Sequence, residues 1–116
     1  MLPKNYFKPQ ELECHCGCHS QGVTPEALLR LNALRSLVGM PFILTSAYRC
    51  SKHPVEAKKA KAGYHNKGIA FDIAITSGKL RARILKYAGI LGFTAYGLSD
   101  EFIHLDLRGE YASWTY

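Results

Sequence analysis

Two histidines and one aspartate are spaced so that a folded chain can bring them to one metal ion. His65 precedes a hydrophobic run, Asp72 interrupts that run between two alanines, and His104 lies within a second apolar run near the C-terminus. Two imidazoles and one carboxylate make the ligand set of a catalytic zinc site, which keeps a fourth position open for water. Zn²⁺ at such a site activates water and polarises a carbonyl, so the pattern predicts amide hydrolysis without a covalent intermediate.

Strand alternation is what would place these ligands together. Residues 68–75 and 102–107 both alternate between apolar and other side chains, as half-buried strands do. One face of each strand is expected to enter the core, while the opposite faces carry Asp72 and His104. The expected core-facing residues are Ile69, Phe71, Ile73, Ile75, Ile103, Leu105 and Leu107. If the two strands share a sheet, Asp72 and His104 face the same space, and His65 joins them from the preceding loop.

The rest of the pattern predicts a small α+β domain around those strands. Thr24 as a cap, Pro25 at the first helical position and Gly39 at the end predict a helix over 25–38. Residues 1–23 are expected to be irregular. The other expected elements are a strand within 41–49, a helical turn after Pro54, a helix from Ser77 to about Gly92, and a strand over 94–98 that a turn at Ser99-Asp100 joins to the last one. This order favours a small, mostly antiparallel sheet with flanking helices.

Length and composition indicate one globular domain. The 116 residues suffice for a single core, so we expect residues 1–116 to form one domain. A monomer is expected, but the oligomeric state does not follow from the sequence. The chain is 47% hydrophobic and 21% charged. It contains no apolar run near the roughly 18 residues that span a bilayer, so no membrane span is predicted. The N-terminus lacks the apolar segment and small-residue cleavage site of a signal peptide, so none is predicted.

The formal net charge of +6 favours an anionic partner. Nucleic acid, a membrane surface and an anionic polymer such as bacterial cell wall all fit that charge. Lys58, Lys59 and Lys61 cluster ahead of His65 in what reads as a solvated loop. The basic residues are scattered over two helices and a loop, not gathered on one face with interleaved aromatics, so no nucleic-acid partner is expected.

Four cysteines form an unusual group: Cys14, Cys16 and Cys18 lie within five residues, and Cys50 lies far along the chain. Packed thiols, a structural metal site, and a disulfide such as one to Cys50 all remain open. The spacing argues against a metal, because structural zinc sites usually place two or more residues between paired cysteines. His15 and His19 are candidate ligands only if such a second site exists.

Three stretches closely resemble the M15 group of zinc peptidases, in particular its small D-Ala-D-Ala carboxypeptidase-like branch, found in bacteria and as phage lysis enzymes. They are LTSAYRC at 44–50, GYHNKGIAFDI at 63–73 and EFIHLDLR at 101–108. These follow the family forms S-x-x-R, H-x6-D-I and F-x-H-x-D-x-R. The opening residues and the helix 25–38 also fit, so the resemblance covers nearly the whole chain. It implies a fold of the Hedgehog and D-Ala-D-Ala peptidase type, with 1–116 as one catalytic domain.

The resemblance implies a role for each motif residue. His65, Asp72 and His104 match the Zn²⁺ ligands, and Arg49 matches the arginine that holds substrate and stabilises the developing oxyanion. The general base is expected to be Glu101, three residues before the last histidine, if it sits in the turn before the strand, where Asp100 competes with it. Asp106 is expected either to be the base or to orient a histidine.

Other positions depart from the family pattern or lie beside it. The family commonly has Ser at the position of Gly63 and a V-G-G turn where this chain has Val55-Glu56-Ala57, which leaves the substrate contacts along 54–64 open. His53 is interpreted as structural. Aromatic residues near the motifs are expected either to touch substrate or to pack over the sheet and line the cleft rim: Tyr48, Tyr64, Tyr96, Trp114 and Tyr116.

Together these observations predict a zinc peptidase that hydrolyses peptidoglycan peptides containing D-amino acids. The alternative is a zinc-retaining, non-catalytic wall- or partner-binding module of the same fold; the acids at Glu101 and Asp106 favour the enzyme. Because no signal peptide is predicted, the protein is expected to reach the wall by lysis, a holin or a virion if it comes from a phage. Which peptide bond is cut and whether the source is bacterial or viral do not follow from the sequence.

Overall fold

A computed structural model describes residues 5–59 and 63–116. Lys61 of the predicted lysine cluster and residues 1–4 of the predicted irregular segment lie outside them. The helices are α1 (Pro9–Leu12), α2 (Pro25–Val38), α3 (Pro54–Ala57) and α4 (Gly78–Ala88). The strands are β1 (Leu44–Ser46), β2 (Ala70–Ala74), β3 (Ala95–Leu98), β4 (Phe102–Asp106) and β5 (Ala112–Thr115).

The five strands form one mixed sheet in the order β1-β2-β4-β3-β5. Three of its four pairings are antiparallel, and β5 joins β3 in parallel. The predicted α+β class and the mostly antiparallel pairing are therefore confirmed. The central pairing is β2 with β4, which are the two strands that carry Asp72 and His104.

Helix α2 has the predicted bounds because its end residues act as expected. The Thr24 hydroxyl accepts a hydrogen bond from the Ala27 N–H at 3.1 Å, and Gly39 leaves the helix with a left-handed φ of 69°. Helix α4 is shorter than the predicted 77–92. It starts after the cap Ser77 but ends at Ala88, and Gly92, with a left-handed φ of 89°, then turns the chain toward β3.

The structure contains two short elements that the sequence pattern did not predict. Helix α1 interrupts the segment expected to be irregular, and its Leu12 is buried and accepts a hydrogen bond from the Tyr48 N–H. Strand β5 follows the last predicted strand and places Trp114 beside Gly97 of β3. Neither segment has the long apolar period on which element prediction depends.

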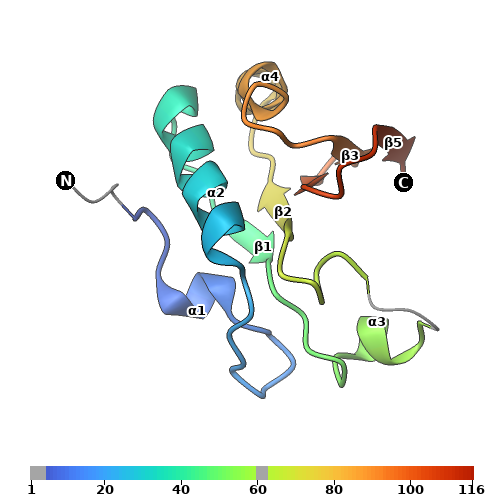
Figure 1. Ribbon diagram of the computed structural model, residues 1–116. Coiled ribbons are helices and arrows are strands. Elements are labelled where there is room, and N and C mark those ends of the chain that lie inside the picture. Colours follow the sequence, from blue (N-terminus) through green and yellow to red (C-terminus); the bar gives the residue numbers. More distant parts are fainter. Residues whose placement is uncertain (1–4, 60–62) are drawn as a thin grey trace.

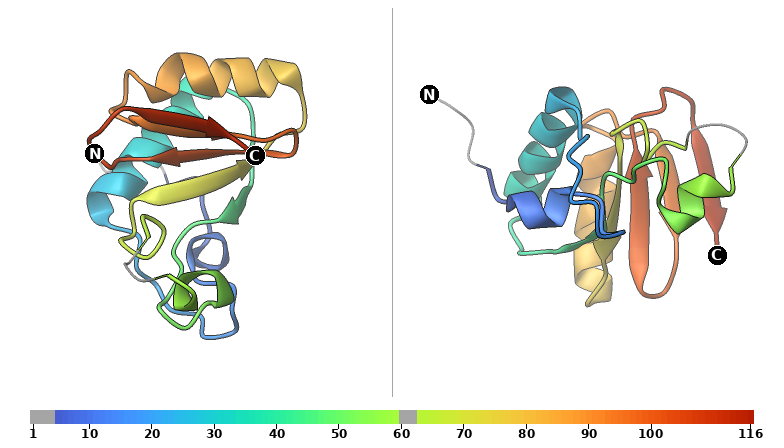
Figure 2. Two further views of the ribbon diagram at one scale, coloured as in Figure 1. Left: turned by 90° about the vertical axis from the view of Figure 1, so that its right-hand side faces the viewer. Right: turned by 90° about the horizontal axis from the view of Figure 1, so that it is seen from below.

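The core lies between the sheet and the two long helices. Figures 1 and 2 show α2 and α4 on the same side of the sheet, with α3 apart from them. Phe71 and Ile73 of β2 and Ile103 and Leu105 of β4 are fully buried in this core, as predicted. The alternation that buries them turns Asp72 and His104 to the other face of the sheet.

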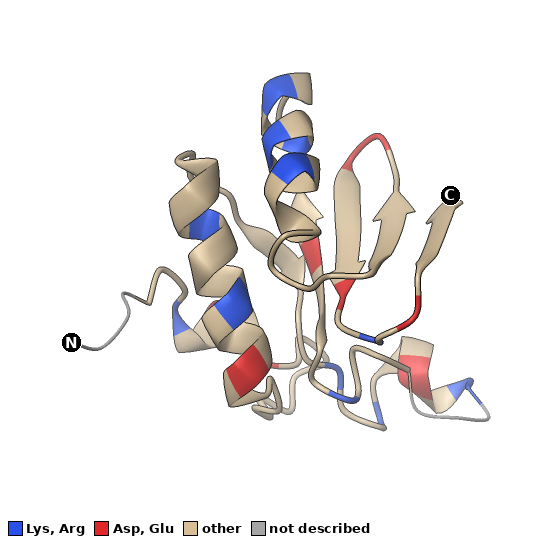
Figure 3. Cartoon of the chain, turned by 45° about the horizontal axis from the view of Figure 1, so that its top comes forward, with Lys and Arg blue, Asp and Glu red and all other residues tan. Residues whose placement is uncertain are grey.

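Basic residues lie on α2, on α4 and around α3 instead of on one face (Figure 3). This distribution matches the scattered pattern that the sequence indicated. Within residues 5–59 and 63–116, no helix is both long enough and apolar enough to cross a bilayer.

Gly68 permits a close chain crossing just before β2, and its replacement by alanine is expected to destabilise the fold. Its φ is 77°, and a Cβ there would stand 1.9 Å from the Gly22 carbonyl oxygen. The left-handed conformation costs a non-glycine residue roughly 1–2 kcal/mol. Overpacking against backbone adds about 1–3 kcal/mol. Chemical denaturation of Gly68→Ala should therefore show about 2–5 kcal/mol less stability than the wild type.

Gly109→Ala is the matched control, because Gly109 has a φ of 87° and no atom lies within 4 Å of the place that a Cβ would take. It should show only the conformational part, roughly 1–2 kcal/mol. Equal losses in the two variants would contradict the close approach of Gly68 to Gly22.

Candidate metal centre

Three donor atoms from two strands and one loop converge on the face of the sheet opposite the core. Asp72 and His104 are direct cross-strand partners in the β2–β4 pairing. The His104 Nδ1 lies 3.0 Å from Asp72 Oδ1, and the His65 Nε2 lies 3.3 Å from the same oxygen. Ligand atoms of all three residues lie within 4.8 Å of one another. The juxtaposition expected from strand alternation is thus present.

In each histidine, the ring nitrogen that does not face Asp72 makes a hydrogen bond that fixes the ring. His65 Nδ1 lies 2.6 Å from the Ala47 carbonyl oxygen, which can only accept, so this nitrogen carries the proton and Nε2 keeps a lone pair. His104 Nε2 lies 2.7 Å from Asp106 Oδ2 and donates its hydrogen to that carboxylate. The Nδ1 of His104 is then unprotonated and has a lone pair for a metal ion. A hydrogen bond from the far nitrogen is the usual way in which proteins orient metal-binding imidazoles.

Burial makes the group costly to maintain unless its charges are paired. His65, Asp72 and His104 are only 4%, 7% and 6% exposed. Burial raises the pKa of Asp72, but the interactions with the neighbouring imidazoles of His104 and His65 outweigh it and hold that pKa well below its ordinary value. Burial lowers the pKa of His104, and the neighbouring carboxylates of Asp106 and Asp72 raise it by more. The carboxylate is therefore ionised, as a metal ligand must be.

Asp106 behaves as a positioning residue. It is fully buried, and both of its oxygens are engaged: Oδ2 contacts His104 Nε2 and Arg108 Nη2, and Oδ1 accepts from the Arg108 N–H and Nε. Burial raises the pKa of Asp106, but His104 and Arg108 lower it to about 2. Of the two predicted roles, orienting a histidine fits this geometry, because a saturated and enclosed carboxylate has no oxygen left to accept a proton from water.

Arg108 is a site residue whose role the sequence did not reveal. Its Nη2 lies 2.6 Å from Asp106 Oδ2, and its guanidinium carbon lies 4.1 Å above the Tyr64 ring and 5.0 Å from the Trp114 ring. It therefore links the carboxylate behind His104 to two aromatic residues of the pocket. Its position in the stretch EFIHLDLR was the available indication.

Arg49 reaches the centre from the loop after β1. Its Nη2 donates to Asp72 Oδ2 at 3.2 Å and its Nε donates to Ser46 Oγ at 3.1 Å. The backbone is also held, because the Arg49 carbonyl accepts from Asn66 Nδ2 at 2.8 Å and its N–H donates to the His65 carbonyl. The guanidinium thus lies beside the three donors, where it can meet a substrate oxygen.

These residues open onto a cavity of about 410 Å³. Among the described residues, its lining includes Tyr64, Trp114 and Tyr116 but neither Tyr48 nor Tyr96. The Tyr96 hydroxyl instead donates to the Phe93 carbonyl. Of the aromatic residues singled out in the sequence, Tyr64 and the two near the C-terminus are therefore the ones that line this cavity.

The loop that departs from the family pattern forms part of the rim, to which Val55, Lys59 and Gly63 contribute. Glu56 is buried there, where it accepts from Lys59 Nζ at 2.8 Å and from the Gly63 N–H at 2.9 Å. His53 accepts from the Val55 N–H through Nδ1 and so caps α3, which matches its structural interpretation.

Glu101 is not brought into contact with the three donors. Glu101 lies in the turn before β4, as its predicted role requires. Its side chain is exposed, however, and lines an adjacent hollow with Asp100 and Arg81. Tyr116 is common to the linings of the two hollows. The role of Glu101 as the base stays a prediction.

Gly97→Ala is expected to displace Trp114 from the centre. The Trp114 ring lies 5.2 Å from the His104 ring, and a Cβ on Gly97 would stand 2.7 Å from Trp114 Nε1. Because the chain has one tryptophan, a red shift of its fluorescence would report the displacement directly. Gly78→Ala, with no atom within 4 Å of its added carbon, should leave the emission unchanged. An unaltered spectrum in Gly97→Ala would contradict the packing of Trp114 on β3.

The donor chemistry fits a metal ion. Two imidazole nitrogens with free lone pairs and one ionised carboxylate point into the same space, and each imidazole is fixed from behind. Three protein ligands beside an accessible cavity are what catalytic zinc sites use, because a fourth position must remain for water or substrate. The α+β domain and this centre together are those of a candidate metal-binding domain, of the kind that hydrolytic enzymes employ.

The chain belongs to the M15 peptidase family. The family model described as Peptidase M15 matches residues 5–106, which include all three donors and Arg49. No curated protein and no solved structure matches the chain. The function is therefore inferred from family membership and from the geometry of the candidate ligands.

Proposed function

We propose that the protein is a zinc-dependent peptidase that hydrolyses peptidoglycan peptides containing D-amino acids. The observation that carries the proposal is the convergence of His65 Nε2, Asp72 Oδ1 and His104 Nδ1 beside Arg49, in a member of the M15 peptidases. The whole chain acts as one catalytic domain of the Hedgehog and D-Ala-D-Ala peptidase type.

Bound zinc would supply Lewis acidity and a water of lowered pKa. The chain's own residues do the rest. Ala47 and Asp106 keep the two imidazoles in the tautomers that ligation needs. Arg49 holds the substrate and stabilises the negative charge that develops on the scissile carbonyl oxygen. Glu101 would act as the general base and accept a proton from the attacking water. The saturated hydrogen bonding of Asp106 supports the choice of Glu101 over Asp106 as this base.

The chemistry of the surface supports a wall substrate. Arg49, Lys59 and Arg108 line the cavity, and the net charge is +6, which attracts an anionic polymer. A short peptide with a terminal carboxylate suits such a lining. The site of action is then the cell wall, reached after lysis, through a holin or from a virion if the protein is phage-derived.

Digestion of purified peptidoglycan and of a synthetic stem pentapeptide, followed by mass spectrometry, tests the proposal. Loss of one alanine from the pentapeptide identifies a D,D-carboxypeptidase, and internal fragments identify an endopeptidase of the stem or cross-link. Either cleavage should stop when a chelator is added. If neither substrate is cut by protein that holds zinc, the chain is a binding module of the same fold and the proposal is wrong.

Arg49→Lys is expected to lower kcat/KM by up to roughly 10²-fold, the lower end of the cost of losing one oxyanion donor. A lysine keeps the charge but cannot reproduce the guanidinium fork that contacts Asp72 and Ser46 together. Steady-state kinetics on the cleaved peptide measure the effect. Arg30→Lys, on α2, should have near-normal kinetics. Near-normal kinetics in Arg49→Lys would remove Arg49 from the site.

A further inference from the structure

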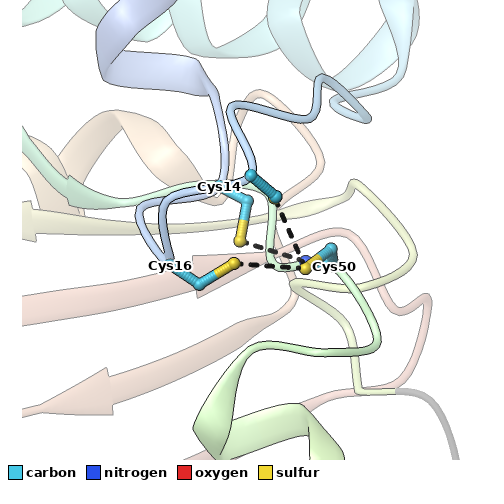
Figure 4. A group of neighbouring side chains, drawn as sticks. Cys14, Cys16 and Cys50 are labelled. Carbon is cyan, nitrogen blue, oxygen red and sulfur yellow. Dashed lines mark hydrogen bonds between the residues drawn. The ribbon is translucent and has the colours of Figure 1, made fainter.

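Four cysteine thiols from two distant segments converge in the structure. The sulfurs of Cys14, Cys16, Cys18 and Cys50 all lie within 4.8 Å of one another. The Cys50 sulfur is 3.5 Å from those of both Cys16 and Cys18. Figure 4 shows the side chains of Cys14, Cys16 and Cys50 directed toward one another. All four cysteines are free.

These separations suit a shared ion. Sulfurs of a disulfide are about 2.05 Å apart. Four thiolates about 2.3 Å from one zinc at tetrahedral angles stand roughly 3.8 Å from each other. The two 3.5 Å contacts of Cys50 are close to the separation at a shared zinc ion and well beyond that of a disulfide, and the whole set lies within 4.8 Å.

The short spacing of the cysteines argued against a zinc site, but the local backbone conformation lets closely spaced cysteines face one ion. Gly17 has a φ of 105° and His19 has a φ of 57°, both in the left-handed region. These residues fold 14–19 into a tight turn, so that cysteines separated by single residues point to one side. The fourth thiol then comes from Cys50, and no pair needs the wider spacing of an ordinary zinc knuckle.

Backbone amides already donate to two of the sulfurs. The Cys50 N–H donates to Cys14 Sγ at 3.3 Å, and the Ser20 N–H donates to Cys18 Sγ at 3.4 Å. Such bonds stabilise negative charge on sulfur and are the usual surroundings of thiolate-bound metals. Cys14 is buried whereas Cys16 and Cys18 are exposed, so an ion can enter from solvent.

The two neighbouring histidines are engaged elsewhere. His15 Nε2 contacts the Gln10 carbonyl oxygen at 3.1 Å, and His19 Nδ1 contacts Glu13 Oε1 at 2.8 Å. The donor set is therefore four sulfurs, which favours a closed structural zinc site and not a catalytic one.

We propose that Cys14, Cys16, Cys18 and Cys50 bind a second, structural zinc ion. Because Cys50 follows Arg49 directly, this ion would fasten the N-terminal segment to the loop that presents the guanidinium to Asp72. The second site would thus position Arg49 and would stabilise a chain too short for a large core.

Cobalt reconstitution of the full chain tests this proposal, because thiolate-bound Co²⁺ gives an intense near-ultraviolet charge-transfer absorption that nitrogen and oxygen ligands do not give. The band is expected in the wild type and in His104→Ala, and it should disappear in Cys16→Ser/Cys18→Ser. Elemental analysis of the zinc-loaded proteins should show one ion fewer per chain in the double variant. His19→Ala is the matched control and should keep the band.

Absence of the band from wild-type protein would overturn the proposal, whether its four thiols react freely or its mass falls by the two hydrogens of a disulfide. If the double variant fails to fold, Cys16→Ser alone, at an exposed position, still gives an answer. It should bind cobalt measurably more weakly than the wild type, and equal affinity would remove Cys16 from the site.

Discussion

His104→Ala is expected to abolish peptidase activity and to lower the zinc content by one ion per chain. The imidazole supplies one of three donors, and its loss leaves Asp72 without its nearest partner and Asp106 without one of its donors. The buried carboxylates of Asp72 and Asp106 each lose one partner while keeping others, which adds a loss of stability of about 1–3 kcal/mol. Turnover of the wall peptide and elemental analysis of the purified variant measure both effects.

Two comparisons isolate the effect of the ligand from that of the fold. His15→Ala removes an exposed histidine in the N-terminal segment and should retain activity. Circular dichroism of His104→Ala should retain the α+β spectrum, because the core lies on the other face of the sheet. Retained turnover in His104→Ala would show that the proposed mechanism is wrong.

Glu101→Gln is expected to retain zinc but to lose about 10²–10⁴-fold in kcat, the usual contribution of a general base. The amide keeps the size of the side chain and removes only its capacity to take a proton. Asp100→Asn is the matched control, since Asp100 lines the same hollow and is the competing acid in the turn. Loss of turnover in Asp100→Asn with normal Glu101→Gln kinetics would transfer the role to Asp100.

Asp106→Asn should act in a different way, because Asp106 orients His104 and pairs with Arg108. The expected result is a fall in zinc affinity of about 10–100-fold, as for other residues that support metal ligands. Excess zinc should restore most of the activity. Full zinc occupancy with lost turnover would instead identify Asp106 as the base.

The parts of the fold that follow from local rules could be predicted. Helix α2 has the expected bounds because Thr24, Pro25 and Gly39 each act within one turn of the helix. Strand β5 could not be predicted in the same way. Its residues alternate only between half-buried and exposed, so its pairing with β3 depends on tertiary contacts such as Trp114 over Gly97.

The candidate site, too, could be predicted only in part from the sequence. Alternation predicted that Asp72 and His104 would share a face, and the β2–β4 register makes them direct partners. What fixes the histidines could not be predicted, because the Ala47 carbonyl is a backbone group and leaves no trace in the sequence. The saturation of Asp106 by Arg108 likewise depends on side-chain geometry that no spacing encodes.

The most direct test of a metal-dependent peptidase centred on His65, Asp72 and His104 is cleavage of a wall peptide by zinc-depleted protein before and after zinc is returned. Depletion should be verified by elemental analysis and the products followed by mass spectrometry. No cleavage is expected from the depleted wild type, cleavage should return with added zinc, and His104→Ala should not recover. Undiminished cleavage by protein shown to be free of metal would contradict metal dependence.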